Sequence, residues 1–392
     1  MSKTTQYDAE LETITADIAA LEGNALTPPI DTERATRYLS CLYQHASLTG
    51  NLKAFRKVES AIDAAIPKMR FAGDLYLLKA NLQFKLHRFH DVTRTLEEAP
   101  LLLDTPEGKV LTADLAFQSG RYGEARQLYG KLVAEEPTWD NLARLAHLQS
   151  KLGDFVAADR LYADAEDELT AKQMRSYAWV QLQRGLLDLD RCSFADAEDH
   201  YRRAEVAYSG YWLVKEHQAA LMGARGDVEE AARLYEEIAA RIPKPELAQA
   251  LGKLYSLMGD RERSEQCYSR AEAAFLESAN AGEVHYYHHL ADLYLHGQDK
   301  PVAALEWARK DWELRDNFST QAVLALALYR NGKVEDAATL IDRALESGVS
   351  DVHVSSTAAR IYKSLGREDE AKAYSARTAQ LGSVHPHFHV HH

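Results

Sequence analysis

The chain has 392 residues, of which 46% are hydrophobic and 27% are charged, and its formal net charge at pH 7 is −13. This length exceeds what one ordinary hydrophobic core organises, yet no linker splits the chain into conventional domains, so a repetitive array is favoured. The negative charge opposes a phosphate backbone, and no block of lysine and arginine compensates it. We therefore expect no nucleic-acid partner.

Two features of the sequence indicate the compartment. The amino-terminal stretch has no basic start followed by an apolar run, and no uninterrupted apolar run is long enough to span a bilayer. We therefore expect no membrane insertion and a cytoplasmic location. Cys41, Cys192 and Cys267 are far apart and outside any CxxC spacing, so neither a disulfide framework nor a zinc knuckle is indicated, and all three are expected to be small buried side chains.

The first part of the chain is predicted to be helical but only weakly repetitive. Residues 1–30 are expected to form a helical segment or cap, in which Ala9 to Leu21 is an amphipathic candidate for capping or for homodimer formation. Residues 31–71 are expected to form a degenerate helical repeat.

A pattern with a period of about 34 residues dominates the rest of the chain, which is the period of helix-turn-helix repeats. In the clearest copy Gly120 marks a turn, Tyr122 follows it, and Ala125, Tyr129 and Leu132 continue the spacing. Similar copies are marked by these residues: His87 and Val92; Gly153, Ala158 and Tyr162; Cys192, Ala197 and Tyr201; Gly226, Ala231 and Tyr235; Gly259, Ser264 and Tyr268; Ala303 and Trp307; Gly332 and Ala337; Gly366 and Ala371.

This pattern has a direct physical interpretation. Glycine permits a left-handed turn between two helices, and the small residue lets the second helix approach the first closely. Each helix pair buries only part of its apolar surface, so neighbouring pairs must stack. The spacing resembles that of the tetratricopeptide repeat family. The resemblance implies an all-α, right-handed superhelical solenoid of antiparallel helix pairs, with about nine repeats over residues 72–383.

The resemblance also implies where a partner binds, because first-helix residues of this family line a concave groove. We select ten residues at matching positions of this chain as partner-binding candidates. They are Arg144, His147, His217, Lys253, His285, His288, His289, Asp292, His296 and Arg360. We therefore expect a non-catalytic scaffold or adaptor for a protein or peptide partner.

The stretch Val284 to His296 holds the densest polar cluster. A single helix here would place Leu290 and Tyr294 on a packing stripe, and His285, His288, His289, Asp292 and His296 on an outward stripe. The outward stripe has three interpretations, which are plain polar surface, hydrogen-bonding partners for a peptide, and a metal site. The metal interpretation uses the pairs His285/His289 and His288/Asp292, whose four-residue spacing suits two ligands of one ion.

A second histidine cluster ends the chain. Residues 384–392 are expected to be a flexible tail, whose candidate metal ligands are His385, His387, His389, His391 and His392. With the groove histidines, they support an alternative function as an accessory protein that binds nickel, copper or zinc. We expect no other cofactor. The chain has no phosphate-binding glycine loop, no dinucleotide fingerprint and no GxSxG nucleophile motif, so we expect no enzyme.

Overall fold

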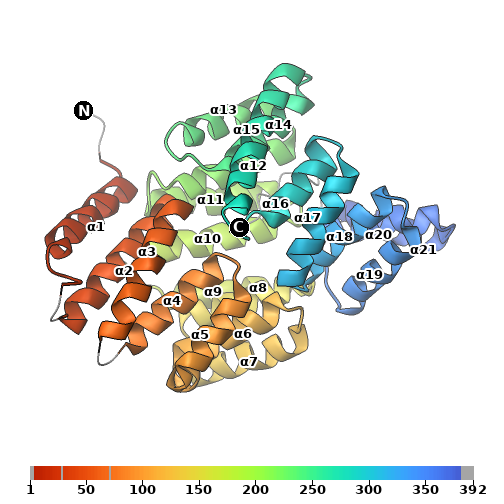
Figure 1. Ribbon diagram of the computed structural model, residues 1–392. Coiled ribbons are helices and arrows are strands. Elements are labelled where there is room, and N and C mark those ends of the chain that lie inside the picture. Colours follow the sequence, from red (N-terminus) through yellow and green to blue (C-terminus); the bar gives the residue numbers. More distant parts are fainter. Residues whose placement is uncertain (1–3, 28–29, 70–71, 381–392) are drawn as a thin grey trace. The chain divides into compact units, whose positions relative to one another are not determined.

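The computed structural model describes residues 4–27, 30–69 and 72–380, and within these residues every regular element is a helix (Figure 1). They form two compact units. Unit 1 comprises the residues up to Thr112 together with Tyr208–Tyr211, and unit 2 comprises Ala113–Ala207 and the residues from Trp212 onward. In the described part of the chain, no helix combines the length and the apolar character needed to cross a membrane.

Unit 1 contains the weakly repetitive part of the sequence. Its elements are α1 (Gln6–Glu22), α2 (Thr32–Thr49), α3 (Leu52–Ala65), η1 (Ile66–Lys68), α4 (Gly73–Lys85), α5 (Phe89–Glu98), η2 (Pro100–Asp104) and the beginning of α6 (Pro106–Gln118). Its core joins α2, α3 and α4 through buried side chains such as Leu39, Phe55 and Leu82. These side chains hold consecutive helices together in the manner of the later repeats.

The predicted amphipathic segment lies within α1, which packs on α2 and on the Tyr208–Tyr211 turn. Tyr7 is 2% exposed, and its ring stacks on Tyr211 with centroids 5.8 Å apart. The Tyr7 amide donates to the Ser209 carbonyl at 3.2 Å, and the Tyr208 hydroxyl donates to Glu10 at 2.5 Å. The N-terminal helix is therefore fixed inside unit 1 by aromatic and polar contacts.

Unit 2 is a run of helix pairs in which each helix packs on the next. The pairs are α6 with α7 (Tyr122–Glu135), α8 (Trp139–Lys151) with α9 (Phe155–Asp167), α10 (Met174–Leu189) with α11 (Phe194–Ala207), α12 (Trp212–Arg225) with α13 (Val228–Ala239), α14 (Pro245–Leu257) with α15 (Arg261–Asn280), α16 (Tyr287–Asp292) and η3 (Leu293–Gly297) with α17 (Pro301–Leu314), α18 (Phe318–Arg330) with α19 (Val334–Glu346), and α20 (Val352–Ser364) with α21 (Glu368–Gln380).

Each predicted turn has a residue in the left-handed backbone region, followed five positions later by a buried small residue. Gly120 has a φ of 72°, and Ala125 is fully buried. The same geometry occurs where glycine is absent, because Cys192 has a φ of 58° and Ala197 is fully buried. Since this turn faces outward, Cys192 is exposed, and the expectation that it is buried is wrong. Cys267 is only partly buried, and Cys41 alone of the three is buried as expected.

One repeat departs from the predicted register. Here the left-handed residue is Asp299, with a φ of 50°, and the fully buried small residue five positions later is Ala304. The prediction assigned this position to Ala303, which is one residue too early. The cause is η3, a π-helical turn, since a π-turn closes its hydrogen bonds over five residues and inserts one extra residue into the helix.

Large aromatic side chains fill the space between paired helices, as the repeat pattern predicts. Tyr162, Tyr201 and Tyr235 are among the largest fully buried side chains. A Cβ atom added at Gly185 would lie 2.2 Å from the Tyr201 ring, and one added at Gly252 would lie 2.6 Å from the Tyr268 ring. The helices approach so closely at these points that only glycine fits.

Candidate functional site

The first helices of successive pairs contact one another directly in unit 2. These contacts join α8 to α10, α10 to α12, α14 to η3, α16 to α18, and α18 to α20. Direct contact between successive first helices is expected on the inner side of a curved array. We call this surface of unit 2 the inner face. The predicted groove positions lie on these first helices or next to them.

A hydrogen-bonded chain of polar side chains lies at the centre of the inner face. The Gln249 amide nitrogen, on α14, donates to the Asp292 carboxylate at 2.8 Å. The Gln249 amide oxygen lies 3.4 Å from Nδ1 of His289, so it accepts a hydrogen bond from this ring nitrogen. His296 Nε2 lies 3.7 Å from the other Asp292 oxygen. Gln249 therefore contacts His289 directly and is connected to His296 through the Asp292 carboxylate.

The basic side chains of Lys253 and Arg360 act electrostatically on this network. Burial lowers the pKa of Lys253 to about 8, against the opposing charge of Asp292. Burial also lowers the pKa of His296, which lies in the electrostatic field of Asp292, Lys253 and Arg360. Although burial by itself raises the pKa of Asp292, His296 and Lys253 hold it below its ordinary value. The carboxylate therefore stays ionised among groups that donate hydrogen bonds.

His285 and His289 are neutral side chains packed against aromatic rings. Burial lowers the pKa of both His285 and His289 to about 3. His289 stacks on Phe275 with ring centroids 5.4 Å apart, and His285 meets Tyr286 edge-on at 4.9 Å. Neither imidazole carries charge near neutral pH.

The outward stripe predicted for this stretch is wrong for two of its members. His288 is 2% exposed and His289 is 9% exposed. The stretch is not one α-helix either, because α16 begins only at Tyr287 and is followed by the π-helical η3. His288 and His289 lie before the π-turn, so their burial comes from the packing of α16, whereas the π-turn changes the direction of side chains from Leu293 onward, including His296.

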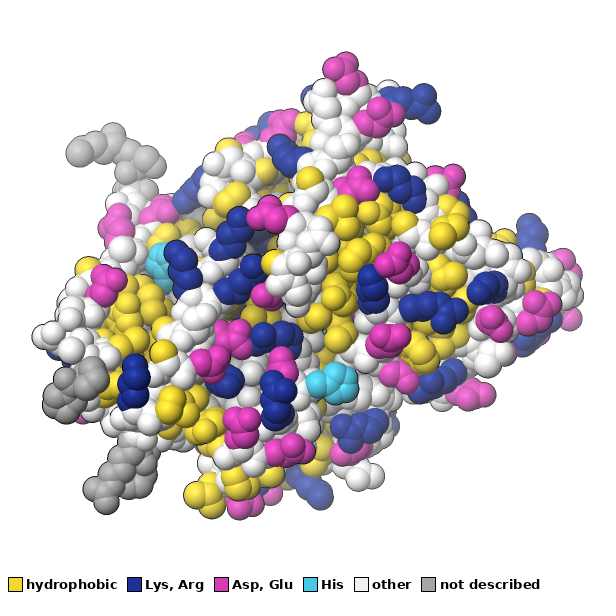
Figure 2. All heavy atoms as spheres, viewed as in Figure 1, with side chains coloured by type: hydrophobic (Ala, Val, Ile, Leu, Met, Phe, Trp, Pro, Cys, Tyr) yellow, Lys and Arg dark blue, Asp and Glu magenta, His cyan; other side chains and the backbone are white. Residues whose placement is uncertain are grey.

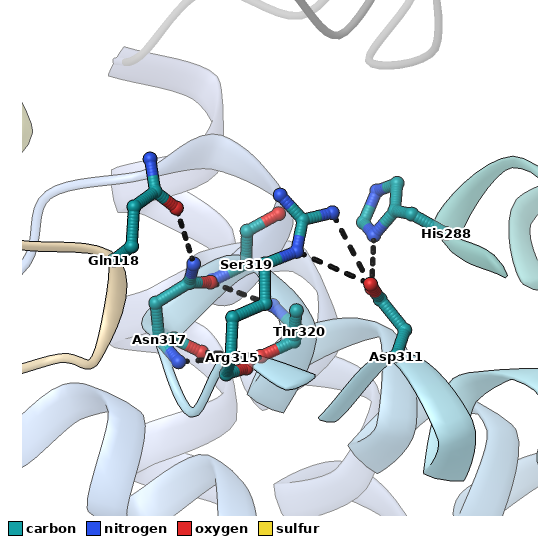
Figure 3. Close-up of polar contacts among 7 residues, drawn as sticks. All are labelled: Gln118, His288, Asp311, Arg315, Asn317, Ser319 and Thr320. Carbon is teal, nitrogen blue, oxygen red and sulfur yellow. Dashed lines mark hydrogen bonds and ion pairs between the residues drawn. The ribbon is translucent and has the colours of Figure 1, made fainter. Parts of the chain in front are cut away.

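His288 belongs to a buried charged triad with Asp311 and Arg315, not to the inner face (Figure 3). Its Nδ1 lies 2.9 Å from one Asp311 oxygen, and Arg315 Nε donates to the other at 3.1 Å. Asp311 is 2% exposed. Although burial by itself raises the pKa of Asp311, Arg315 and His288 lower it to about 2. The triad ties α16 to α17 through three side chains.

Asp311 was not predicted from the sequence, because the register of this repeat is shifted by one residue. Seven positions after the buried small residue, other repeats carry a buried apolar side chain, such as Leu132, Ala165 or Ile238. Counting from Ala304 places Asp311 at this core position, whereas counting from Ala303 places Lys310 there. A carboxylate at a core position would have been the signal for a buried partner.

Other predicted groove residues lie apart from this network. On α8, Arg144 Nε pairs with Asp114 at 3.1 Å, and its guanidinium also pairs with Asp140 at 2.5 Å. His147 lies edge-on to Phe117, and burial lowers its pKa to about 3.

On α12, His217 is 3% exposed, its Nδ1 donates to the Leu213 carbonyl at 2.8 Å, and its ring meets Tyr201 edge-on at 5.6 Å. The structure therefore places His217 in the core of its own repeat. Arg360 lies exposed on α20.

A second charged cluster lies between α12 and α14. Glu216 is 1% exposed, and burial raises its pKa to about 7 against the opposing charge of Lys244. Lys244 Nζ lies 3.5 Å from Glu246 and 4.9 Å from the centre of the Trp212 ring. The Tyr286 hydroxyl reaches Glu246 at 3.5 Å. Glu216 is therefore the carboxyl group here that can exchange a proton near neutral pH.

The metal hypothesis gains no geometric support from the described residues. Among them, no group of three or more His, Cys, Asp or Glu side chains is arranged to hold a metal ion. The tail candidates His385, His387, His389, His391 and His392 lie outside the described residues. Metal binding stays a prediction, which titration of Zn²⁺ into the full chain and into a chain truncated after Leu381 would test.

Comparison with known proteins identifies the fold. No protein-family model and no curated protein matches the chain. The solved Cut9–Hcn1 hetero-tetramer of the APC/C aligns with a TM-score of 0.51 at 14% identity, over 83% of this chain and 60% of that one. At this identity the likeness shows the fold alone, a solenoid of antiparallel helix pairs. The chain spans 60% of the length of this neighbour.

Two further structures align with lower scores. A tetratricopeptide repeat protein from Parabacteroides merdae has a TM-score of 0.38 at 15% identity, over 64% of this chain and 95% of that one. A monomeric mutant of IFIT1 with Gppp-AAAA has a TM-score of 0.43 at 14% identity, over 96% of this chain and 98% of that one.

Proposed function

We propose that this chain, an all-α solenoid of the tetratricopeptide type, is a non-catalytic scaffold that binds a protein or peptide partner on the inner face of unit 2. The observation that carries the proposal is the network of Gln249, Lys253, Asp292 and His296, with Arg360 beside it. These groups come from α14, α16, η3 and α20, so they converge although they are far apart in sequence.

The chemistry of the network suits a polypeptide. It presents a carboxylate, a carboxamide, an imidazole, an amine and a guanidinium, which together donate to and accept from backbone amides and polar side chains. Charges of both signs are interspersed on the face of the molecule in Figure 2, which does not present one extended field of a single sign. Mixed charge favours a partner of matching pattern over a polyphosphate.

The fold neighbour supports the same function. The Cut9–Hcn1 structure is described as a hetero-tetramer, so a protein with a similar fold assembles with a second protein. We extend only the class of function to this chain, because similarity of fold does not transfer the identity of a partner.

Affinity capture with matched variants tests the proposal. We expect the wild-type chain to capture a partner that is lost from a variant carrying both Lys253→Ala and Arg360→Glu. The control is Arg261→Glu, since the Arg261 side chain is 90% exposed on α15, away from the inner face. Buried or central interface groups typically cost about 2 kcal/mol or more when removed, a loss of about thirtyfold in affinity. Equal capture by the double variant and the control would refute the inner face as the binding surface.

A further inference from the structure

Two parts of unit 2 that are about 200 residues apart in the sequence touch each other. The Phe318 amide donates to the Tyr122 hydroxyl at 2.9 Å, and the Asn317 side-chain nitrogen donates to Gln118 at 3.2 Å (Figure 3). The Ser350 amide donates to the Lys151 carbonyl at 2.8 Å. Repeats of a solenoid ordinarily contact only their neighbours, so these contacts are additional to repeat stacking.

We define the clasp as Gln118–Tyr122 and Lys151–Gly153 on one side, with Asp316–Phe318 and Ser350 on the other. Its first side is the pair of turns that follow α6 and α8. Its second side is the pair of turns that precede α18 and α20.

The turn that carries Asp316 and Asn317 is rigidly held before it meets its partner. Asp316 accepts hydrogen bonds from Trp312 Nε1 at 2.7 Å and from Gln321 at 2.8 Å, and it pairs with Arg343. Asn317 caps α18 in a capping box. Because this turn is held by hydrogen bonds within its own repeat, its donor groups are already in fixed positions. Few further side chains must become ordered when it contacts the opposing turn.

Two glycines allow the opposing turns to come this close. A Cβ atom added at Gly120 would lie 2.3 Å from the Asp316 carbonyl oxygen, and one added at Gly153 would lie 2.8 Å from the Ser350 Cβ. The equivalent turn glycines Gly226 and Gly332 have open space around this position. The close approach is therefore special to the clasp and is not a requirement of the repeat turn.

The clasp is small compared with the core that surrounds it. It consists of three hydrogen bonds and one ring contact, between Tyr122 and Phe318 with centroids 6.0 Å apart. Each neutral hydrogen bond contributes modestly to stability, and these contacts join turns and not the two helices of a pair. The clasp can therefore open without loss of the helix pairs.

We propose that the clasp gates the inner face of unit 2, so that a polypeptide partner gains access when the clasp opens. When it is closed, the helices from α6 to α18 form a continuous ring of contacts around their own inner face. A partner that engages the network of Asp292 and Lys253 must pass this ring. The inference rests on the proposed function for the kind of partner that enters, whereas the clasp itself is tested without a partner.

Hydrogen exchange of two amides reports directly on the clasp. Phe318 begins α18 and Ser350 precedes α20, so neither amide has an acceptor within its own helix. We expect Gly120→Ala to speed exchange of both amides by about tenfold relative to Gly332→Ala, because only the first variant clashes with the opposing turn. The control is matched because Gly120 and Gly332 have φ values of 72° and 75°.

A second variant guards against misfolding. Tyr122→Phe retains the buried ring and removes the oxygen that accepts the Phe318 amide, so we expect faster exchange at Phe318 with the helix core still protected. Equal exchange in the Gly120→Ala and Gly332→Ala variants would overturn the clasp itself.

Thiol labelling tests the gating. In a chain with Cys192→Ser, the variant Lys253→Cys is labelled with a small maleimide and with a maleimide carrying a polymer of about 5 kDa. We expect Gly120→Ala to accelerate the bulky reagent by about tenfold or more and to leave the small one unchanged, as for local opening. If the bulky reagent reacts equally fast with and without Gly120→Ala, the clasp does not gate, and the partner-capture result for the inner face is unaffected.

Discussion

Replacement of Asp311 by asparagine tests the buried triad, because it removes one charge and nearly preserves the shape. Asp311 has a pKa of about 2 in the folded chain, compared with about 3.9 for an unfolded aspartate, and this difference corresponds to roughly 2–3 kcal/mol. Asp311→Asn should therefore lower the free energy of unfolding by about 2–3 kcal/mol at pH 7. Asp311→Ala should cost about 3–5 kcal/mol, since it leaves the Arg315 charge, with a side chain 13% exposed, without its carboxylate.

The sign of the pH dependence follows from the lowered pKa. The unfolded aspartate binds a proton more readily than the folded one, so the stabilisation is fully present above pH of about 4 and is lost as the pH falls towards about 2. The wild type and the asparagine variant should converge in stability over this interval. The assay is urea unfolding by circular dichroism at several pH values, with hydrogen exchange of α16 and α17 as the local measurement.

The control lies on the same helix. Glu306 pairs with Lys310 at 2.7 Å, but the Glu306 side chain is 62% exposed, so Glu306→Gln should cost less than about 0.5 kcal/mol. If Asp311→Asn is as mild as Glu306→Gln at pH 7, or if its effect does not fade below pH of about 4, the buried triad does not stabilise this joint as argued.

Four other variants test the packing, the turns and the buried amine. Gly185→Ala should destabilise the chain by about 1–3 kcal/mol because its Cβ meets the Tyr201 ring, whereas Gly130→Ala on α7, in open space, should stabilise it by up to about 1 kcal/mol in thermal or urea unfolding. Cys192→Gly should raise stability by about 0.5–1 kcal/mol, since a left-handed φ strains a side chain; a loss of stability would contradict the repeat geometry. Lys253 has a lowered folded-state pKa, so wild-type stability should rise between pH 8 and about 10, and Lys253→Met should abolish this rise in urea titrations.

The repeat architecture could be predicted from the sequence because it depends on local conformation. The period of about 34 residues, the left-handed turn residues and the small residues five positions later are all visible without coordinates. Even Cys192, in place of a glycine, adopts the predicted turn. Short-range steric contacts determine these features, so the sequence of each repeat is enough to predict the fold of that repeat.

The arrangement of the candidate site depended on tertiary structure. The sequence placed Lys253, Asp292 and His296 on the inner face, but His288 is buried against Asp311, and a π-turn moves the register of the following helix by one residue. The contact of Asn317 with Gln118 leaves no periodic signal, because it joins turns about 200 residues apart. Periodicity within the sequence therefore determined which surface of each helix packs, and the closure of unit 2 on itself decided which polar side chains meet.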